Sequence, residues 1–252
     1  MRDIRKCRRS FLGVIGVVAG LSLLSTAASA QVIDLRAKPR VAAPNSSPFG
    51  LSYGDWSAAW WQWASALPVP GHPLFDETGA QCGAGNSGPV WFLGGVINET
   101  GSAVRNCALP SGTTVFFPIL NVECSNVEGN GVNAVELRAC AVSFMELATD
   151  MVAEIDGERI PHLQRFRVQS GTFPFALPDD NFFQFFGVTA ATPGTCFFPA
   201  EGGNCEPYLS FGDGVYLMAG PLSDGQHTIH IHGTFSGIFT LDVVYHLTVG
   251  ID

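Results

Sequence analysis

The segment SYGDWSAAWWQWASALP, residues 52–68, contains four of the five tryptophans in the chain. Ser52 followed by Asp55 is typical of a capping box, and Pro68 is typical of a helix end because proline has no backbone N–H. Apolar residues recur at steps of three and four positions, which places them on one helix face: Trp56, Ala59, Trp60, Trp63, Ala64 and Leu67. The segment therefore predicts an amphipathic helix that covers a β-sheet with its aromatic face.

Trp61 lies outside this stripe and has two interpretations. In the first, its ring belongs to the core with the other tryptophans. In the second, Trp61 and the neighbouring Gln62 form a platform for a sugar ring, because an indole offers a large flat apolar face with one polar group. The sequence leaves both interpretations open.

Apolar runs after this helix predict strands. Residues 89–96 form one strand, and residues 113–121 (TTVFFPILN) form another that is apolar on both alternating faces. Such a strand lies in a sheet covered on both sides, and Pro118 within it predicts an edge position or a bulge. Asn121 and Glu123 come where this strand should end, so they are either candidate ligand-binding residues or part of a solvated loop.

The middle of the chain predicts a second helix over residues 132–154, where apolar residues share one face and charged residues the other. Asp156-Gly157 is typical of a tight hairpin turn, and further strands are predicted over residues 165–170 and 172–177. Six phenylalanines then gather on a long segment, where they either fill a core or line an apolar groove: Phe182, Phe183, Phe185, Phe186, Phe197 and Phe198.

The C-terminal residues 226–249 alternate apolar and polar side chains, which predicts an antiparallel hairpin with one buried face. His230 and His232 share the polar face, and a hairpin symmetric about Phe235 would place Asp242 one diagonal step from His230. Two imidazoles and a carboxylate form a plausible zinc, copper or iron set, so these three residues are candidate ligands of a divalent metal. The alternative is an ordinary polar sheet surface.

The first thirty residues have the features of a secretory signal peptide, with a basic head, an apolar stretch and the cleavage site Ala28-Ser29-Ala30. Arg8-Arg9 also fits the twin-arginine export motif, although ordinary secretory signals share such pairs. We therefore expect an exported protein, periplasmic or extracellular. It has three expected parts: a signal peptide over residues 1–30, an extended arm over residues 31–50 and a single domain over residues 51–252.

The charge of the chain excludes several partners. Removal of the signal peptide would take away five basic side chains and one acidic side chain, which changes the formal net charge from −9 to −13. Nucleic-acid binding needs clustered Lys and Arg, which this acidic chain lacks. No later apolar run reaches the length of a membrane span. We therefore expect neither a nucleic-acid partner nor a membrane span in the mature chain.

Six of the seven cysteines follow the expected signal peptide, and an even number in an exported chain predicts disulfides. None has the C-x-x-C spacing of a zinc or redox site. Sequence alone does not choose a connectivity. We predict that neighbours pair, because each such pair brackets one local unit: Cys82–Cys107, Cys124–Cys140 and Cys196–Cys205.

Four motifs resemble those of a group of uncharacterised secreted bacterial proteins. They are WSAAWWQW (56–63), GPVWFL (88–93), the run from LPSG to FFPILN (109–121) and PLSDGQHTIHIHG (221–233). The resemblance covers most of the mature chain. It implies no activity and assigns no functional residue.

Together these patterns predict a mainly β fold: a β-sandwich, jelly-roll or immunoglobulin-like, that is covered by two helices and stapled by disulfides. The leading functional expectation is a soluble exported binding protein for a carbohydrate or an apolar small molecule. Its candidate ligand contacts are Trp61, Gln62, Asn121 and Glu123.

The alternative is an exported enzyme. A hydrolase would need a pair of carboxyl groups, drawn from Asp55, Asp76, Glu123 and Glu128. A metal-dependent enzyme would use His230, His232 and Asp242. We expect no cofactor other than that divalent metal.

Overall fold

The computed structural model describes residues 40–188 and 208–250. The predicted signal peptide and the predicted Cys196–Cys205 disulfide lie outside these residues. In the described part of the chain, no helix is long and apolar enough to cross a membrane.

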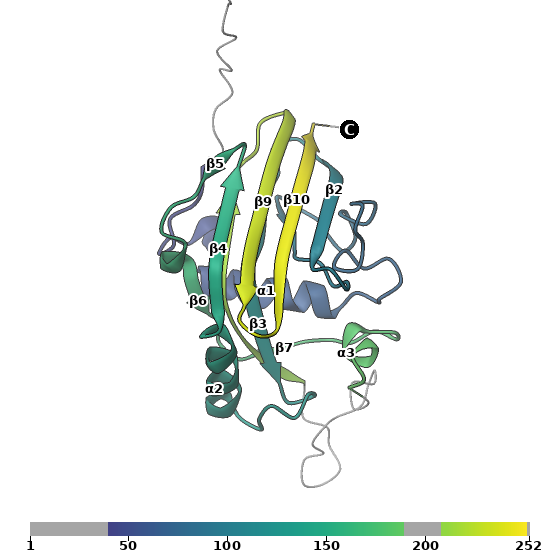
Figure 1. Cartoon of the computed structure of the whole chain (residues 1–252), viewed down its shortest axis with the longest axis vertical. Coiled ribbons are helices and arrows are strands. Elements are labelled where there is room, and N and C mark those ends of the chain that lie inside the picture. Colours follow the sequence, from purple (N-terminus) through teal and green to yellow (C-terminus); the bar gives the residue numbers. More distant parts are fainter. Residues whose placement is uncertain (1–39, 189–207, 251–252) are drawn as a thin grey trace, which may run out of the picture. The chain divides into compact units, whose positions relative to one another are not determined.

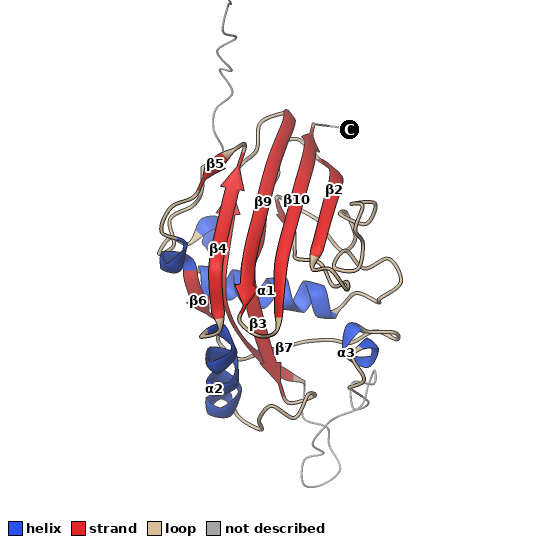
Figure 2. Cartoon of the chain, viewed as in Figure 1, coloured by secondary structure: helices blue, strands red, loops and turns tan. Residues whose placement is uncertain are grey.

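Strands dominate the described residues and form two sheets (Figures 1 and 2). The first sheet has the order β1-β3-β8-β6, with β7 also paired to β8, and the second has the order β2-β10-β9-β4-β5. Each sheet is mixed, because β1 runs parallel to β3 and β2 runs parallel to β10.

The bounds of the elements follow the chain in order. The strands are β1 (Val90–Phe92), β2 (Ser102–Leu109), β3 (Thr114–Ser125), β4 (Ala148–Ile155), β5 (Glu158–Arg159), β6 (Arg167–Gln169), β7 (Phe173–Pro174), β8 (Leu209–Ala219), β9 (Gly225–Phe235) and β10 (Phe239–Val249). The α-helices are α1 (Tyr53–Ser65), α2 (Ala134–Met145) and α3 (Phe182–Phe185), and short 3-10 turns cover Pro48–Gly50 and Leu163–Phe166.

The two sheets pack face to face around one apolar core. Alternate residues of the central strands of both sheets are buried there: Val115, Phe117, Val215, Leu217, Ile229, Ile231, Val243, Tyr245 and Leu247. The predicted β-sandwich is thereby confirmed, and so is the buried face of the C-terminal hairpin.

Helix α1 covers the outer face of the first sheet, where it packs against β8, β6 and β3. Ser52 and Asp55 form the predicted capping box. Trp60 and Trp63 are buried with Phe116 of β3 in a second core between helix and sheet. β3 is therefore covered on both faces, as its doubly apolar pattern predicted.

The indole N–H groups of α1 fasten loops to the helix. Trp56 donates to the carbonyl of Pro48 over 2.9 Å, Trp60 to that of Leu93 over 2.8 Å and Trp63 to that of Ala84 over 3.0 Å. A buried indole needs such a partner. The tryptophan-rich helix is thus the element on which segments before and after it are anchored.

The prediction of a helix over residues 132–154 is wrong in its second half. Helix α2 ends at Met145, and residues from Ala148 onward form β4, which pairs with β9. Backbone pairing with a free sheet edge outweighs the local helical pattern here, because intrinsic propensity is a weak preference. A shift of register between Thr149 and Val152 accompanies the change, and Asp150 has a positive φ of 53°.

The two hairpin predictions had different outcomes. The β4–β5 turn lies at Asp156-Gly157, both with positive φ, as predicted. The hairpin of β9 and β10 is not symmetric about Phe235, because Phe235 pairs with Phe239 and the turn lies between them. This correction places Asp242 directly opposite His232.

Two of the predicted disulfides are present. Cys82 is bonded to Cys107 in β2, with Cα atoms 5.8 Å apart. Cys124 at the end of β3 is bonded to Cys140 of α2, with Cα atoms 6.1 Å apart. The second bond holds α2 against the far end of β3 and β8, where Leu137, Ala141 and Phe211 form a small core of their own.

Candidate functional site

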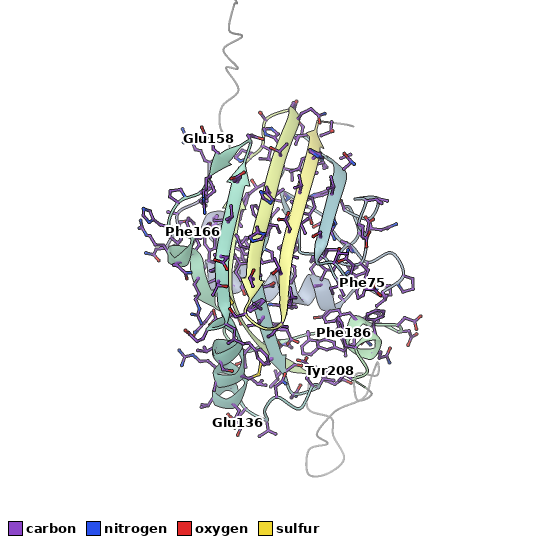
Figure 3. The ribbon with its side chains drawn as sticks, viewed as in Figure 1. Phe75, Glu136, Glu158, Phe166, Phe186 and Tyr208 are labelled. Carbon is purple, nitrogen blue, oxygen red and sulfur yellow. A yellow bond between two sulfur atoms is a disulfide. The ribbon has the colours of Figure 1, made fainter. Side chains whose placement is uncertain are left out.

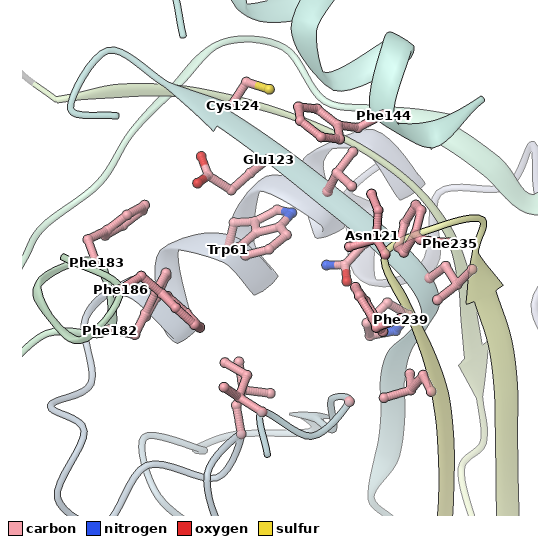
Figure 4. Close-up of a pocket in the computed structure, with 18 of the residues that line it drawn as sticks. Trp61, Asn121, Glu123, Cys124, Phe144, Phe182, Phe183, Phe186, Phe235 and Phe239 are labelled. Atoms are coloured by element: carbon pink, nitrogen blue, oxygen red, sulfur yellow. The ribbon is translucent and has the colours of Figure 1, made fainter. Parts of the chain in front are cut away.

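A cavity of about 440 Å³ opens at one end of the two sheets (Figure 4). Its walls come from α1, α3, the middle of β3, the β9–β10 turn, the C-terminal end of α2 and the loop after β1. The lining residues include Trp60, Trp61, Leu74, Val96, Ile97, residues 118–124, Glu128, Asn130, Phe144, Phe182, Phe183, Phe186, Val188, Phe235, Ile238, Phe239 and Leu241. Three of the four predicted ligand contacts, Trp61, Asn121 and Glu123, are among them.

The cavity follows an edge of β3 that has no strand beside it in the described residues. Strand β1 pairs only with Thr114–Phe116, so the β1-side edge of β3 beyond Phe116 is left without a partner strand. Pro118 lies on this open part, where its missing N–H costs no pairing. The short length of β1 therefore leaves space for the cavity.

A bulge in β3 turns Asn121 and Glu123 toward α1. Before the bulge, the even-numbered side chain of Phe116 packs under the helix. The register against β8 shifts between Pro118 and Leu120, and one extra residue moves all later side chains to the opposite face. The odd-numbered Asn121 and Glu123 therefore lie on the helix side. Pro118 predicted a bulge, but not that the bulge would position these two residues.

Two glycines of β8 make room for side chains of this wall, Gly212 for the Trp61 ring and Gly214 for Asn121 and Tyr216. Gly212 pairs with Glu123 and Gly214 pairs with Asn121. A Cβ atom on Gly212 would lie 3.1 Å from Cδ1 of Trp61, so a side chain there would push the indole away. The buried Nε1 of Trp61 lies beside the hydroxyl of Tyr216 but forms no hydrogen bond of good geometry within the described residues.

Asn121 and Tyr216 form the polar contact at this wall. Asn121 Nδ2 donates to the Tyr216 hydroxyl over 3.1 Å. Burial raises the pKa of Tyr216, and the hydrogen bonds to its oxygen oppose this shift only in part. Tyr216 therefore stays a neutral phenol that holds Asn121 in place.

The carboxyl groups of Glu123 and Glu128 are neighbours in the cavity wall, where Glu123 is half-buried and Glu128 is exposed. Ser210 Oγ donates a short hydrogen bond to Glu123 Oε2, and Ser125 Oγ donates to Glu128 Oε2 over 2.8 Å. Burial is the largest cause that raises the pKa of Glu123 well above its ordinary value of 4.5, and the charge of Glu128 and the hydrogen bond to it add to the shift. Glu123 therefore keeps its proton at a pH where an exposed glutamate is ionised.

The phenylalanine-rich segment supplies one wall, so its two interpretations both hold in part. Phe182 and Phe183 of α3 are buried and line the cavity, while Phe186 lies at the rim (Figures 3 and 4). Phe197 and Phe198 lie outside the described residues. Four apolar side chains form what we call the rim, because they line the cavity and are exposed by 44 to 59%: Phe144, Phe186, Ile238 and Phe239.

A buried arginine holds the loop that closes another side of the cavity. Arg105 of β2 is 1% exposed, and its Nη1 donates to the carbonyls of Gly94 and Gly95 over 3.1 and 3.0 Å. The same nitrogen lies 2.5 Å from the Tyr245 hydroxyl, which in turn donates to Gly94 O. This network fixes the path of residues 94–97, of which Gly95, Val96 and Ile97 line the cavity.

Gln62 does not belong to this cavity. Its side chain donates to the carbonyl of Pro174 over 2.8 Å at the protein surface. Adjacent residues of a helix point in directions about 100° apart, so Trp61 and Gln62 face different neighbours. The predicted pair of Trp61 and Gln62 as one platform is therefore corrected to Trp61 alone.

The candidate metal residues come together on the outer face of the second sheet. His230 Nε2 is 3.2 Å from Asp242 Oδ1, His232 Nδ1 is 3.0 Å from Asp242 Oδ2, and Glu154 lies 3.8 Å from His230 Nδ1. Both imidazoles are directed at the carboxylate between them. Within residues 40–188 and 208–250 no group of three metal-ligating side chains has a geometry that could hold an ion. A divalent metal at these residues stays a prediction.

Sequence reasoning missed several cavity residues. Ile238 and Phe239 belong to a hairpin turn, and Phe144 lies near the end of α2, so each looked like part of its own element. Ser210 comes to Glu123 only because β8 pairs with β3. The one signal in the sequence was the pair Ile238-Phe239 directly after Gly237, because large apolar residues are unusual at a hairpin turn.

Comparison of the chain with protein-family models, with curated proteins and with solved structures found no match. The resemblance to secreted bacterial proteins stays a prediction, and the chemistry of the cavity is the basis for any assignment of function.

Proposed function

We propose that the protein is an exported binding protein whose cavity holds a small apolar molecule. The observation that carries the proposal is a cavity of about 440 Å³ with aromatic walls and an exposed apolar rim. Small-molecule sites have this size and are mostly apolar with a few placed polar groups. Export is supported by the two disulfides, because such bonds persist in oxidising compartments.

An apolar ligand fits the lining better than a carbohydrate. Among the described lining residues, the side chains with amide or carboxyl groups are Asn121, Glu123, Glu128 and Asn130. A sugar carries a hydroxyl on nearly every carbon, and each would lose water without gaining a partner against the remaining apolar walls. Trp61 therefore serves as an apolar contact rather than as part of a sugar site.

Binding of a fluorescent probe tests this function. N-phenyl-1-naphthylamine is neutral and apolar, and we expect it to bind the wild type and to fluoresce. Trp61→Ala should weaken its binding roughly tenfold, because it removes most of a large apolar contact. Phe239→Ala should weaken binding by a smaller factor without loss of a core side chain.

Phe49→Ala is the matched control, because Phe49 is 55% exposed and lies outside the cavity. It should bind the probe as the wild type does. Absence of probe binding to the wild type, or equal affinities of the Phe239 and Phe49 variants, would contradict the proposed function.

The carboxyl pair supports a second candidate, an exported hydrolase in which Glu123 is the general acid. Glu123, whose pKa is raised, can donate its proton to a leaving group, and the neighbouring Glu128 supplies the second carboxyl group. Turnover of a chromogenic ester or glycoside that Glu123→Gln abolishes would favour this candidate over binding alone. A metal-dependent activity at His230, His232 and Asp242 is a further proposal, and metal analysis of the purified protein tests it.

A further inference from the structure

The charged side chains in the cavity wall have only one sign. Glu123 and Glu128 line the cavity, and no Lys, Arg or His is among the described lining residues. No basic side chain of the described part of the chain forms an ion pair with either glutamate, whereas Asp213, buried nearby in β8, is paired with Arg167 over 2.9 Å. The protein thus compensates one buried carboxylate in this region and leaves the pair in the cavity without a counter-charge.

The Glu123–Glu128 pair presents carboxyl oxygens to the cavity. Two neighbouring carboxylates repel one another, and the charge of Glu128 is one of the causes that raise the pKa of Glu123. The hydroxyl of Ser125 donates to Glu128 and that of Ser210 donates to Glu123. Both hydrogen bonds stabilise negative charge on the carboxyl pair. Glu123 is half-buried and Glu128 is exposed, and among the described lining residues no basic side chain supplies an opposite charge to them. A cation from a ligand would supply that opposite charge.

Aromatic rings surround the position that such a cation would take. In Figure 4 the carboxyl group of Glu123 points into the cavity between the Trp61 ring and the Phe183 side chain. Faces of aromatic rings attract cations, and tryptophan does so best. An anionic head group, such as a carboxylate, would instead meet the negative charge of the pair with no basic side chain to offset the repulsion.

We propose that the ligand is an apolar amine, whose alkyl or aromatic body fills the cavity and whose ammonium group binds to the Glu123–Glu128 pair. This inference rests on the proposed binding function and adds the charge of the ligand. The rim of Phe144, Phe186, Ile238 and Phe239 contacts the apolar body at the mouth, and the carboxyl pair selects the cationic end. The acidic net charge of the chain, −9, also attracts cations from solution.

Three probes of equal chain length test the charge of the ligand: decylamine, decanol and decanoate. Each is titrated at neutral pH against the protein loaded with N-phenyl-1-naphthylamine. We expect decylamine to displace the dye at a concentration at least tenfold below that of decanol, and decanoate to be the weakest. Decanol as the tightest of the three, or decanoate tighter than decanol, would overturn the inference.

The double variant Glu123→Gln/Glu128→Gln tests the carboxyl pair itself. Glutamine keeps the size of the side chain and its ability to hydrogen-bond, but removes the charge. Binding of decylamine should weaken at least tenfold, to the level of decanol, while binding of decanol stays unchanged. Retained decanol binding shows that the double variant is folded. If the double variant does not fold, the ranking of the three probes on the wild type still tests the proposal.

Glu99→Gln is the matched control, because Glu99 is exposed and lies outside the cavity. It should leave the preference for decylamine intact, and an equal loss in this variant would assign the effect to net charge and overturn the inference. Failure of the dye and of all three probes would instead contradict the proposed function. Equal displacement by decylamine and decanol would overturn the inference, because the cavity would then bind apolar molecules without selecting a cation.

Discussion

Glu123 lies in β3 opposite Gly212, so the ring of Trp61, rather than a β8 side chain, lies beside it (Figure 4). The neighbouring carboxyl group of Glu128 and the hydroxyl of Ser210 complete its surroundings. An ordinary glutamate in sequence thus becomes a proton-holding group, because its neighbours remove water and add a second negative charge. At the scale of single residues, the chemistry of this protein is set by what packs around a side chain.

Glu123→Gln should change how stability depends on pH. The pKa of Glu123 is raised in the folded protein above 4.5, so the folded state binds its proton more tightly than the unfolded state does. This contribution is fully present below pH 4.5 and is lost as the pH rises through the raised pKa. The free energy of unfolding of the wild type should therefore fall over this range, and that of the variant should fall less. Urea denaturation from pH 4.5 to about pH 8 measures both.

Glu99→Gln serves again as the control, since it removes an exposed carboxyl group outside the cavity. Its pH profile should be parallel to that of the wild type. A Glu123 variant whose profile is also parallel to the wild type would show that the pair does not hold its proton as described.

Helix α1 acts as an anchor through its side chains as well as a cover for the sheet. Three of its four indole N–H groups donate to carbonyls of neighbouring loops. The carbonyl that Trp60 binds belongs to Leu93, two residues before Gly95 in the cavity wall. The position of the helix therefore determines the shape of the cavity.

Ser52→Ala should lower the free energy of unfolding by about 1 kcal/mol, because it removes the side-chain half of the capping box. In the wild type Ser52 Oγ accepts from the Asp55 N–H over 3.2 Å, and the Asp55 carboxylate accepts from the Ser52 N–H over 3.0 Å. Urea denaturation measures the change. Ser46→Ala is the control, since Ser46 is outside the helix and its hydroxyl bonds only the carbonyl of Ala43. Equal stabilities of the two variants would be evidence against the cap.

Three layers of structure make up the described molecule: the second sheet, the first sheet and α1. Strands β3 and β8 are shared by both cores, since one face meets the other sheet and the other face meets the helix. The cavity forms where β3 and β8 extend past β1 and past the turn of β9 and β10 (Figure 1). The cavity therefore depends on where the layers end relative to one another, and no single layer forms it.

The disulfide between Cys124 and Cys140 should stabilise this end of the molecule. It closes a sequence separation of 16 residues, and a loop of that length implies roughly 3 kcal/mol in the chain-entropy account. We expect Cys124→Ala/Cys140→Ala to lower the free energy of unfolding by about 2–4 kcal/mol, and to weaken dye binding because Phe144 of α2 lies at the rim. Denaturation and dye titration measure the two effects. A double variant as stable as the wild type would contradict a stabilising role of this disulfide.

Much of the fold could be predicted because it depends on local patterns. The capping box, the aromatic face of α1, the doubly covered strand and the alternating C-terminal strands each follow from a periodicity that burial imposes on nearby residues. The pairing of cysteines followed from their order along the chain. The second half of the predicted helix over residues 132–154 failed for the opposite reason, since the free edge of β9 that recruits β4 is distant in sequence.

The amino-acid sequence by itself determined the class of fold and the candidates Trp61, Asn121 and Glu123, and it left the disulfide connectivity open. Only the tertiary structure decided that these three face one cavity, that Gln62 does not, and that Glu128 and Ser210 join Glu123. The physical reason is that the cavity depends on a one-residue bulge, on the length of β1 and on pairings between distant strands. The periodicity of a segment reflects the burial of nearby residues and does not indicate these long-range contacts.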